Sequence, residues 1–277
     1  MRRLLIVGFG DIAHRTVALL PKQVEVRAVS RTQGIDLDRP ETLLAFCGWA
    51  DTVLHTAPPP GQGTTDTRTR SLLAALEAGG ILPRRVVYIG TSGVYGDCGG
   101  AWVDENRPTN PQTPRAVRRA DAERQLLAWG EMHDSAVVVL RAPGIYAADR
   151  LPVERLMQGI PTLADEDDMY TNHIHADDLA AIAFAALNAD APPGVYNASD
   201  DTEMKMGEWF DLVAARLGLP KPARVARAEA AKSIPAAMLS FMGESRRLVN
   251  RKMKEGLRVK LAYPTVHEGV AMKRRAA

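Results

Sequence analysis

The chain has 277 residues, of which 46% are hydrophobic and 25% charged, a composition typical of a globular protein with one large or two modest domains. Its 35 basic and 33 acidic residues leave a formal net charge of only +2, and aromatic residues make up 5%. We therefore expect no nucleic-acid partner, because the sequence has neither a basic excess nor a series of stacking aromatic side chains.

Cysteine content and hydropathy bear on where the protein works. Cys47 and Cys98 are too few and too far apart for a disulfide scaffold or a multi-cysteine metal site. This favours a reducing, cytoplasmic setting. No apolar stretch approaches the roughly 18 to 20 residues that span a bilayer, so we expect no membrane partner.

Short apolar runs alternate with longer amphipathic stretches in the first half of the chain. The predicted strands are Leu4–Val7, Val24–Val29, Thr52–His55, Val86–Gly90 and Ala136–Leu140. The predicted helices between them are Ile12–Leu20, Thr67–Ala78 and Arg115–Trp129. Continuous apolar runs indicate strands covered on both faces, as in a parallel sheet with crossover helices. The fold class is therefore α/β, with a doubly wound Rossmann sheet.

The pattern becomes irregular after Leu140. The later predicted elements are strand Asn172–His175, helix Asp177–Asn188, which we expect Asp177 to cap, strand Val195–Asn197 and helix Met206–Leu217. We expect residues 1–146 to form a nucleotide-binding domain to which 172–197 return, with 147–171 and 198–277 forming a smaller C-terminal α/β lobe that binds substrate.

A glycine-rich turn follows the first predicted strand. The segment Gly8-Phe9-Gly10-Asp11-Ile12-Ala13 fits the G-x-G-x-x-G/A pattern. Gly8 would make the tight turn, Gly10 would let the backbone approach a pyrophosphate, and the amides of the helix that starts near Asp11 would face the phosphates. The alternative is a glycine turn that serves packing alone.

The end of the second predicted strand bears on the choice of nucleotide. NAD-binding proteins usually place an acidic residue there for the ribose hydroxyls, whereas this chain has Ser30-Arg31-Thr32. The Arg31 guanidinium suits a 2′-phosphate, so the sequence favours NADP over NAD. The alternative is a solvated surface arginine.

Several separated motifs occur in order along nearly the whole chain, and together they resemble the extended short-chain dehydrogenase/reductases, the NAD(P)-dependent nucleotide-sugar epimerases and dehydratases. The segments that carry the resemblance are Gly34–Leu37, Val53–Ala57, Val86–Gly96, Leu140–Tyr146, His173–Ala180, Tyr196–Asn197 and Leu261–Gly269. Val53–Ala57 is similar to the family's fourth-strand segment, and Val86–Gly96 to its fifth-strand motif. With the glycine turn, the resemblance implies cofactor contacts from Gly8, Gly10, Asp11, Ile12, Arg31, Asp36, Leu37, Thr56, Ala57, Pro58, Gly90, Pro143 and Ile145.

The catalytic positions depart from the family pattern. The resemblance puts Thr91 at the catalytic Ser/Thr, but Arg115 at the Tyr and Arg119 at the Lys of the Tyr-x-x-x-Lys pair. An arginine with a pKa above about 12 is almost never deprotonated at pH 7, so Arg115 cannot be an ordinary general base. The chain therefore resembles an atypical member of the family. Tyr95 or Tyr146 is a candidate substitute acid, or else an ordinary packing residue.

The leading hypothesis is an NADP-dependent oxidoreductase or epimerase acting on a small or sugar-like hydroxy or carbonyl compound, which can be anionic. The alternative is a non-catalytic NADP(H)-binding sensor or regulator. By analogy with the family a homodimer is plausible.

His173 and His175 fit the family motif better than a metal site. The basic stretch from Arg246 to Lys260 is read as a charged helix face, with an anionic ligand as the alternative, and Asp165–Asp168 as a solvated loop.

Overall fold

The computed structural model describes residues 1–46 and 48–270, so Cys47 lies outside the described residues. A parallel sheet of six strands forms the centre of the molecule, in the order β11-β6-β4-β3-β1-β2. Its strands are β1 (Arg3–Val7), β2 (Glu25–Val29), β3 (Thr52–His55), β4 (Arg85–Ile89), β6 (Ala136–Arg141) and β11 (Gly194–Asn197). The α/β class and the doubly wound sheet expected from the sequence are confirmed.

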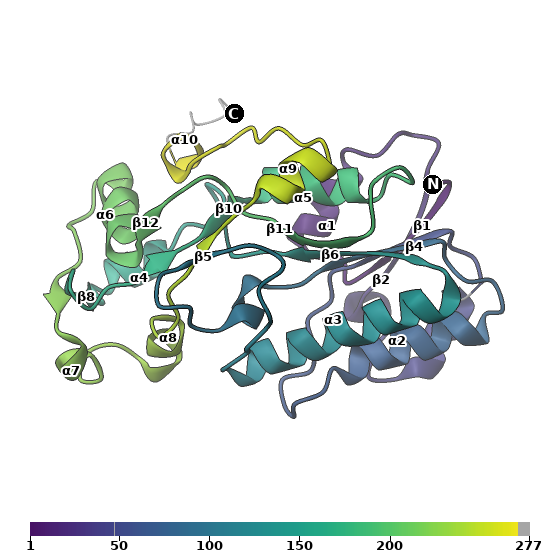
Figure 1. Ribbon diagram of the computed structural model, residues 1–277, viewed down its shortest axis with the longest axis horizontal. Coiled ribbons are helices and arrows are strands. Elements are labelled where there is room, and N and C mark those ends of the chain that lie inside the picture. The colour runs from purple at the N-terminus through teal and green to yellow at the C-terminus, as the bar shows by residue number, and fades with distance from the viewer. Residues whose placement is uncertain (47, 271–277) are drawn as a thin grey trace.

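Helices cover both faces of this sheet (Figure 1). One face carries α2 (Thr67–Ala78) and α3 (Pro114–His133), and the other carries α1 (Asp11–Val17), α5 (Ala176–Ala186) and α9 (Arg251–Gly256). Alternate residues of each strand point to opposite faces, so the sheet separates two hydrophobic clusters. Burial on both sides explains why most of these strands read as continuous apolar runs. The exception is the edge strand β2, in which residues 25–27 are exposed.

The strand order places the loops that follow β1, β2 and β3 at one edge of the sheet. From β1 the chain first proceeds to β2 on one side, and β3 then pairs with β1 on its other side. Ligands of open α/β sheets bind outside the carboxyl ends of the strands at such a reversal. Residues 40–46 form a 3-10 helix, η2 (Pro40–Phe46), and the strand that the resemblance numbers fourth is therefore the third here.

The C-terminal part of the chain is interwoven with the sheet. After β6 the chain leaves it, returns through α5, and adds β11 beside β6. The outlying region contains α4 (Val153–Met157), α6 (Met206–Leu217), α7 (Arg227–Ala230), α8 (Ala236–Phe241), α10 (Val266–Val270) and the paired short strands β7 (Gly144–Tyr146) with β10 (His173–His175), β8 (Thr162–Leu163) with β13 (Arg224–Val225), β9 (Tyr170–Thr171) with β12 (Met204–Lys205), and β5 (Trp102–Val103) with β14 (Arg247–Leu248).

The predicted start of α5 needs a correction. Its N-cap is His175, whose Nδ1 accepts a hydrogen bond from the backbone NH of Asp177 at 3.2 Å. Asp177 lies inside the first turn and instead pairs with Arg15.

Within residues 1–46 and 48–270, we find no helix with the length and apolarity that crossing a bilayer requires.

Candidate functional site

Gly8 forms the tight turn at the end of β1. Its φ is +90°, and a Cβ built there would lie 2.5 Å from the backbone N of Ala57, which follows β3. The backbone NH of Gly8 donates to Val29 O at 3.0 Å, and that of Ala57 donates to Val7 O at 3.0 Å. Only glycine fits here, because the ends of three strands meet at this residue.

Gly10 has a different surrounding. It is the N-cap of α1 in an extended conformation, with φ −98°, and a Cβ built there would meet no protein atom within 4 Å. Asp11 and Ile12 form the first positions of α1. The space above Gly10 is therefore open, as close approach of a pyrophosphate to the backbone requires.

The glycine-turn cavity, of about 310 Å³, opens at the ends of β1, β2 and β3. It is lined by Gly8, Phe9, Gly10, Val29, Ser30, Arg31, Thr32, Ile35, Asp36, Leu37, Leu43, Thr56, Ala57, Pro58 and Arg68. Eight of the predicted cofactor-binding residues therefore line one cavity: Gly8, Gly10, Arg31, Asp36, Leu37, Thr56, Ala57 and Pro58. Asp11 and Ile12 lie beside it on α1. The remaining candidates, Gly90, Pro143 and Ile145, lie elsewhere.

Arg68 is a lining residue that sequence reasoning missed. Its Nε and Nη2 donate to the Asp38 carboxylate at 2.9 and 2.6 Å, and its Nη1 donates to Pro58 O at 3.1 Å. The hydrogen bonds from Arg68 hold the pKa of Asp38 below its ordinary value, and the charge of Arg31 contributes. The guanidinium-bearing residues Arg31 and Arg68 therefore both line the cavity, and Arg68 neutralises Asp38.

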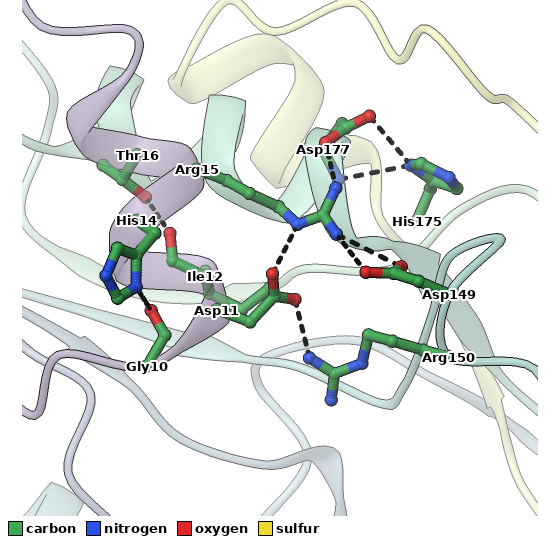
Figure 2. A network of polar contacts seen from close by, with 10 residues as sticks. All are labelled: Gly10, Asp11, Ile12, His14, Arg15, Thr16, Asp149, Arg150, His175 and Asp177. Carbon is green, nitrogen blue, oxygen red and sulfur yellow. Dashed lines mark hydrogen bonds and ion pairs between the residues drawn. The ribbon is translucent and has the colours of Figure 1, made fainter. Parts of the chain in front are cut away.

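A network of charges surrounds the first turn of α1 (Figure 2). Asp11 accepts from Arg15 Nε at 2.8 Å and from Arg150 Nη1, also at 2.8 Å. Arg15 also contacts Asp177 at 2.6 Å and Asp149 at 3.3 Å. Although partial burial opposes the shift, the two arginines lower the pKa of Asp11. Loop residues 149–150 are thereby tied to the glycine turn.

A second space, the Arg115 cavity, has a volume of about 250 Å³. It is lined by Thr91, Ser92, Gly93, Thr113, Arg115, Ala116, Pro143, Gly144, Tyr170, Thr171, Asn172, Met206, Ser240, Phe241, Glu244 and Arg246. It lies between the loop after β4, the start of α3 and the outlying region. Of the predicted catalytic and nicotinamide-side residues, the cavity brings together Thr91, Arg115 and Pro143.

The two arginines at the family's Tyr and Lys positions have different surroundings. Arg119 turns to the end of β4, where its Nη1 donates to Tyr88 Oη at 2.9 Å and to Ile89 O at 3.1 Å. Arg115 is exposed in the cavity, and its guanidinium lies 5.8 Å from the Phe241 ring centre. Partial loss of hydration, together with the like charge of Arg119, lowers the pKa of Arg115.

The remaining candidate groups can now be placed. Thr91 is the N-cap of η3 (Ser92–Tyr95), where its hydroxyl accepts from Gly93 NH at 3.2 Å. Tyr95 is 1% exposed and donates to Asn197 Oδ1 at 2.8 Å, and Tyr146 is 2% exposed. Neither tyrosine lines the Arg115 cavity, whose own tyrosine is Tyr170.

The histidines of β10 are buried, and burial lowers the pKa of His173 to about 3. Across the part of the chain that the structure describes, no group of three or more His, Cys, Asp and Glu residues is placed to hold a metal ion. In the basic stretch from Arg246 to Lys260, some cations form ion pairs within the protein: Arg247 pairs with Glu203, and Lys254 pairs with Asp201.

The acidic segment Asp165–Asp168 is not wholly a solvated loop, because the Asp168 carboxylate accepts a hydrogen bond from Gly207 NH at 2.8 Å.

Comparisons with known proteins agree with this geometry. The sequence model of the NAD dependent epimerase/dehydratase family matches residues 13–199. The dTDP-D-glucose 4,6-dehydratase of Mus musculus is 26% identical over 141 residues, which cover 48% of this chain and 39% of that protein. This match therefore spans well under half the length of the mouse protein.

Solved structures match almost the whole chain. A functionally unknown conserved protein from Silicibacter pomeroyi is 29% identical, with a TM-score of 0.78 and coverage of 98% of this chain and 97% of that one. RMD from Pseudomonas aeruginosa, complexed with NADPH, is 19% identical, with a TM-score of 0.74 and the same coverage of 98% and 97%. At 19% identity, the similarity to RMD shows that the two proteins share a fold.

Proposed function

The chain belongs to the NAD-dependent epimerase/dehydratase family, and from this premise we propose that it binds NADP(H) and transfers hydride between the nicotinamide and a hydroxyl or carbonyl substrate. One observation carries the proposal: two cavities open at the same edge of one parallel sheet, one built around the glycine turn and the other around Thr91 and Arg115. The first takes the dinucleotide and the second the substrate.

The preference for NADP rests on Arg31. This residue lines the glycine-turn cavity, and its guanidinium can give charge-assisted hydrogen bonds to a 2′-phosphate. Asp38, which would otherwise weaken the attraction for a phosphate, is already paired with Arg68 at 2.6 Å. Thr56, Ala57 and Pro58 complete the wall of this cavity. Open space above Gly10 supports the pyrophosphate position.

The chemistry must use groups of the Arg115 cavity. Thr91 can orient the reacting oxygen, while Arg115 stays a cation and cannot take up a proton. The other lining groups that can exchange a proton are the phenol of Tyr170 and the carboxyl of Glu244. We assign the proton transfer to one of these two residues. The bound nicotinamide would supply hydride transfer, and the chain's own residues would orient the substrate and move the proton.

A second candidate function is a non-catalytic NADP(H) sensor. The arginines at the family's Tyr and Lys positions favour it, because neither can perform the proton transfer of that pair. A sensor requires that NADP⁺ and NADPH bind with different affinity and change the association state of the protein.

Nucleotide titration followed by an activity screen tests both functions. We expect NADP(H) to bind more tightly than NAD(H). Arg31→Ala should lose about 10- to 100-fold of NADP(H) affinity and little NAD(H) affinity, while the exposed Arg39→Ala, outside the cavity, should change neither. Equal affinities in the unmutated protein would contradict the cofactor assignment.

The activity screen follows NADPH oxidation with carbonyl compounds and nucleotide sugars. Turnover that is lost in either Tyr170→Phe or Glu244→Gln, with NADPH binding retained, supports the enzyme and identifies the proton-transfer group. Tight NADPH binding without turnover, together with a redox-dependent association state, would instead support the sensor.

A further inference from the structure

Arg115 differs from the other charged residues of its cavity because it has no counter-ion among residues 1–46 and 48–270. Arg246 pairs with Glu244 at 2.9 Å and also donates to Gly96 O at 2.5 Å. Among the described residues no carboxylate forms an ion pair with Arg115, whose recorded contact is the Phe241 ring. With Arg246 and Glu244 cancelling, the charged lining residues leave one net positive charge.

The Arg115 guanidinium is only partly hydrated in its cavity. Surrounding protein atoms remove part of the hydration of Arg115, and Arg119 adds a repelling charge from the next helical turn. A guanidinium presents its N–H groups as a fork that matches a carboxylate in two parallel hydrogen bonds. A ligand with an anionic group would therefore relieve the repulsion and satisfy donors that the protein leaves unused.

The volume of the cavity bears on the size of the group that it can enclose. At about 250 Å³ it lies below the range of roughly 300 to 1,000 Å³ typical of sites for drug-sized ligands. A compound of a few carbon atoms fits inside this partly open cavity, whereas most of a nucleoside diphosphate would extend outside it. The single net charge also matches a carboxylate better than a phosphate monoester, which carries about −1.5 to −2 at pH 7.

We propose that the substrate is a small monocarboxylic acid bearing a hydroxyl or carbonyl group, and that Arg115 binds its carboxylate. The inference rests on the proposed function, because it takes the Arg115 cavity as the substrate site. Thr91 lines the same cavity, and its hydroxyl, which accepts a hydrogen bond from Gly93 NH, can donate its own proton to the hydroxyl or carbonyl oxygen of the substrate. Arg115 is thus a substrate-binding residue that sets specificity, in place of a proton-transfer group.

Calorimetric titration of the NADP⁺-saturated protein tests this assignment. The probes are lactate and glycerate, with lactamide as a neutral analogue of the same shape, inorganic phosphate and UDP-glucose. Lactate or glycerate should bind more tightly than the other probes. Arg115→Gln should weaken the binding of the acids about 10- to 100-fold, and Arg115→Lys should weaken it less. Arg124→Gln is the matched control, because Arg124 lies on the same helix with a side chain 71% exposed.

NADP⁺ binding is measured in the same samples and separates the two proposals. If NADP⁺ fails to bind, the proposed function falls, and this inference with it. If NADP⁺ binds normally, three results would each overturn the substrate class alone: equal binding of lactamide and lactate, tighter binding of phosphate or UDP-glucose, or unchanged binding of the acids in Arg115→Gln.

Discussion

Glu123 on α3 and Arg141 at the end of β6 form a buried ion pair, with Nη2 and Oε2 2.8 Å apart and side chains 4% and 7% exposed. The Arg141 guanidinium also lies 4.6 Å from the centre of the Tyr95 ring. Burial alone would lower the pKa of Arg141, but the Glu123 carboxylate raises it above its ordinary value. The pair lies close to Gly90, the residue before Thr91, because a Cβ built at Gly90 would be 3.2 Å from Glu123 Oε1.

Glu123→Gln should lower the free energy of unfolding by about 3 to 5 kcal/mol, because it leaves the Arg141 charge buried without a counter-ion. Urea denaturation followed by circular dichroism measures the change. The exposed Arg124→Gln, which breaks the pair with Asp121, should cost no more than about 1 kcal/mol. A similar cost for both variants would show that the buried pair is not a special constraint.

The two glycines of the turn should respond differently to alanine. Gly8→Ala should unfold more easily, because the new Cβ meets Ala57 and φ is positive. Gly10→Ala should keep the stability of the unmutated protein, since its Cβ meets no protein atom, yet lose NADPH affinity. Thermal denaturation and fluorescence titration separate the two effects. Retained NADPH affinity in Gly10→Ala would contradict the pyrophosphate position.

Asp11 carries a negative charge at the entrance to the expected pyrophosphate position. It pairs with Arg150 at 2.8 Å and with Arg15, which it shares with Asp177 and Asp149. Arg150→Gln should weaken NADPH binding, by roughly tenfold at low salt and less at high salt, because it removes a positive charge and leaves Asp11 only partly neutralised by the shared Arg15. Adding Asp11→Asn to that variant should restore much of the loss. A double variant that binds no better than Arg150→Gln would rule out this charge effect.

Asp200 should make stability depend on pH. It is 4% exposed, and burial raises its pKa to about 7, with repulsion from Asp201 and Asp178 adding to the shift. Between about pH 4 and 7 the folded protein holds a proton that the unfolded chain has released, so the free energy of unfolding falls as pH rises through this range and then levels off.

Asp200→Asn should remove this contribution. The variant should be more stable than the unmutated protein above pH 7, by as much as about 4 kcal/mol, with a flatter profile between pH 5 and 7. Chemical denaturation across pH measures both. Asp190→Asn, at an exposed position, serves as the control. Parallel profiles for the unmutated protein and Asp200→Asn would exclude Asp200 as the titrating group.

Local signals predicted much of the fold. Helix α2 begins and ends as predicted because Asp66 caps it, accepting from the backbone NH groups of Arg68 and Thr69. Helix α6 ends as predicted because Gly218 takes a left-handed conformation with φ +69°. The start of α5 was misread because the sequence offers both His175 and Asp177, and the backbone geometry of β10 places the imidazole in the capping position.

Contacts between residues far apart in the sequence were not predicted. The pairing of Arg68 with Asp38 joins residues 30 positions apart, and that of Arg150 with Asp11 joins residues 139 apart. No periodicity or motif encodes such pairs, since each depends on how strands and loops meet in three dimensions. The motifs did locate much of the lining of the glycine-turn cavity, because those residues lie next to recognisable strands. Arg115, in the first turn of α3, was located by the resemblance to the family's Tyr-x-x-x-Lys pattern.

The interweaving of the outlying region with the sheet affects how this protein can be cut or recombined. Because β11 pairs with β6 after the chain has passed through residues 147–171, neither part is a continuous segment. A protease that nicks one connection should leave both fragments associated, and exchanging the outlying region with that of a relative would require at least two simultaneous crossovers. Diversification of such a site is therefore expected to proceed by point substitution, as at Arg115, more readily than by shuffling of modules.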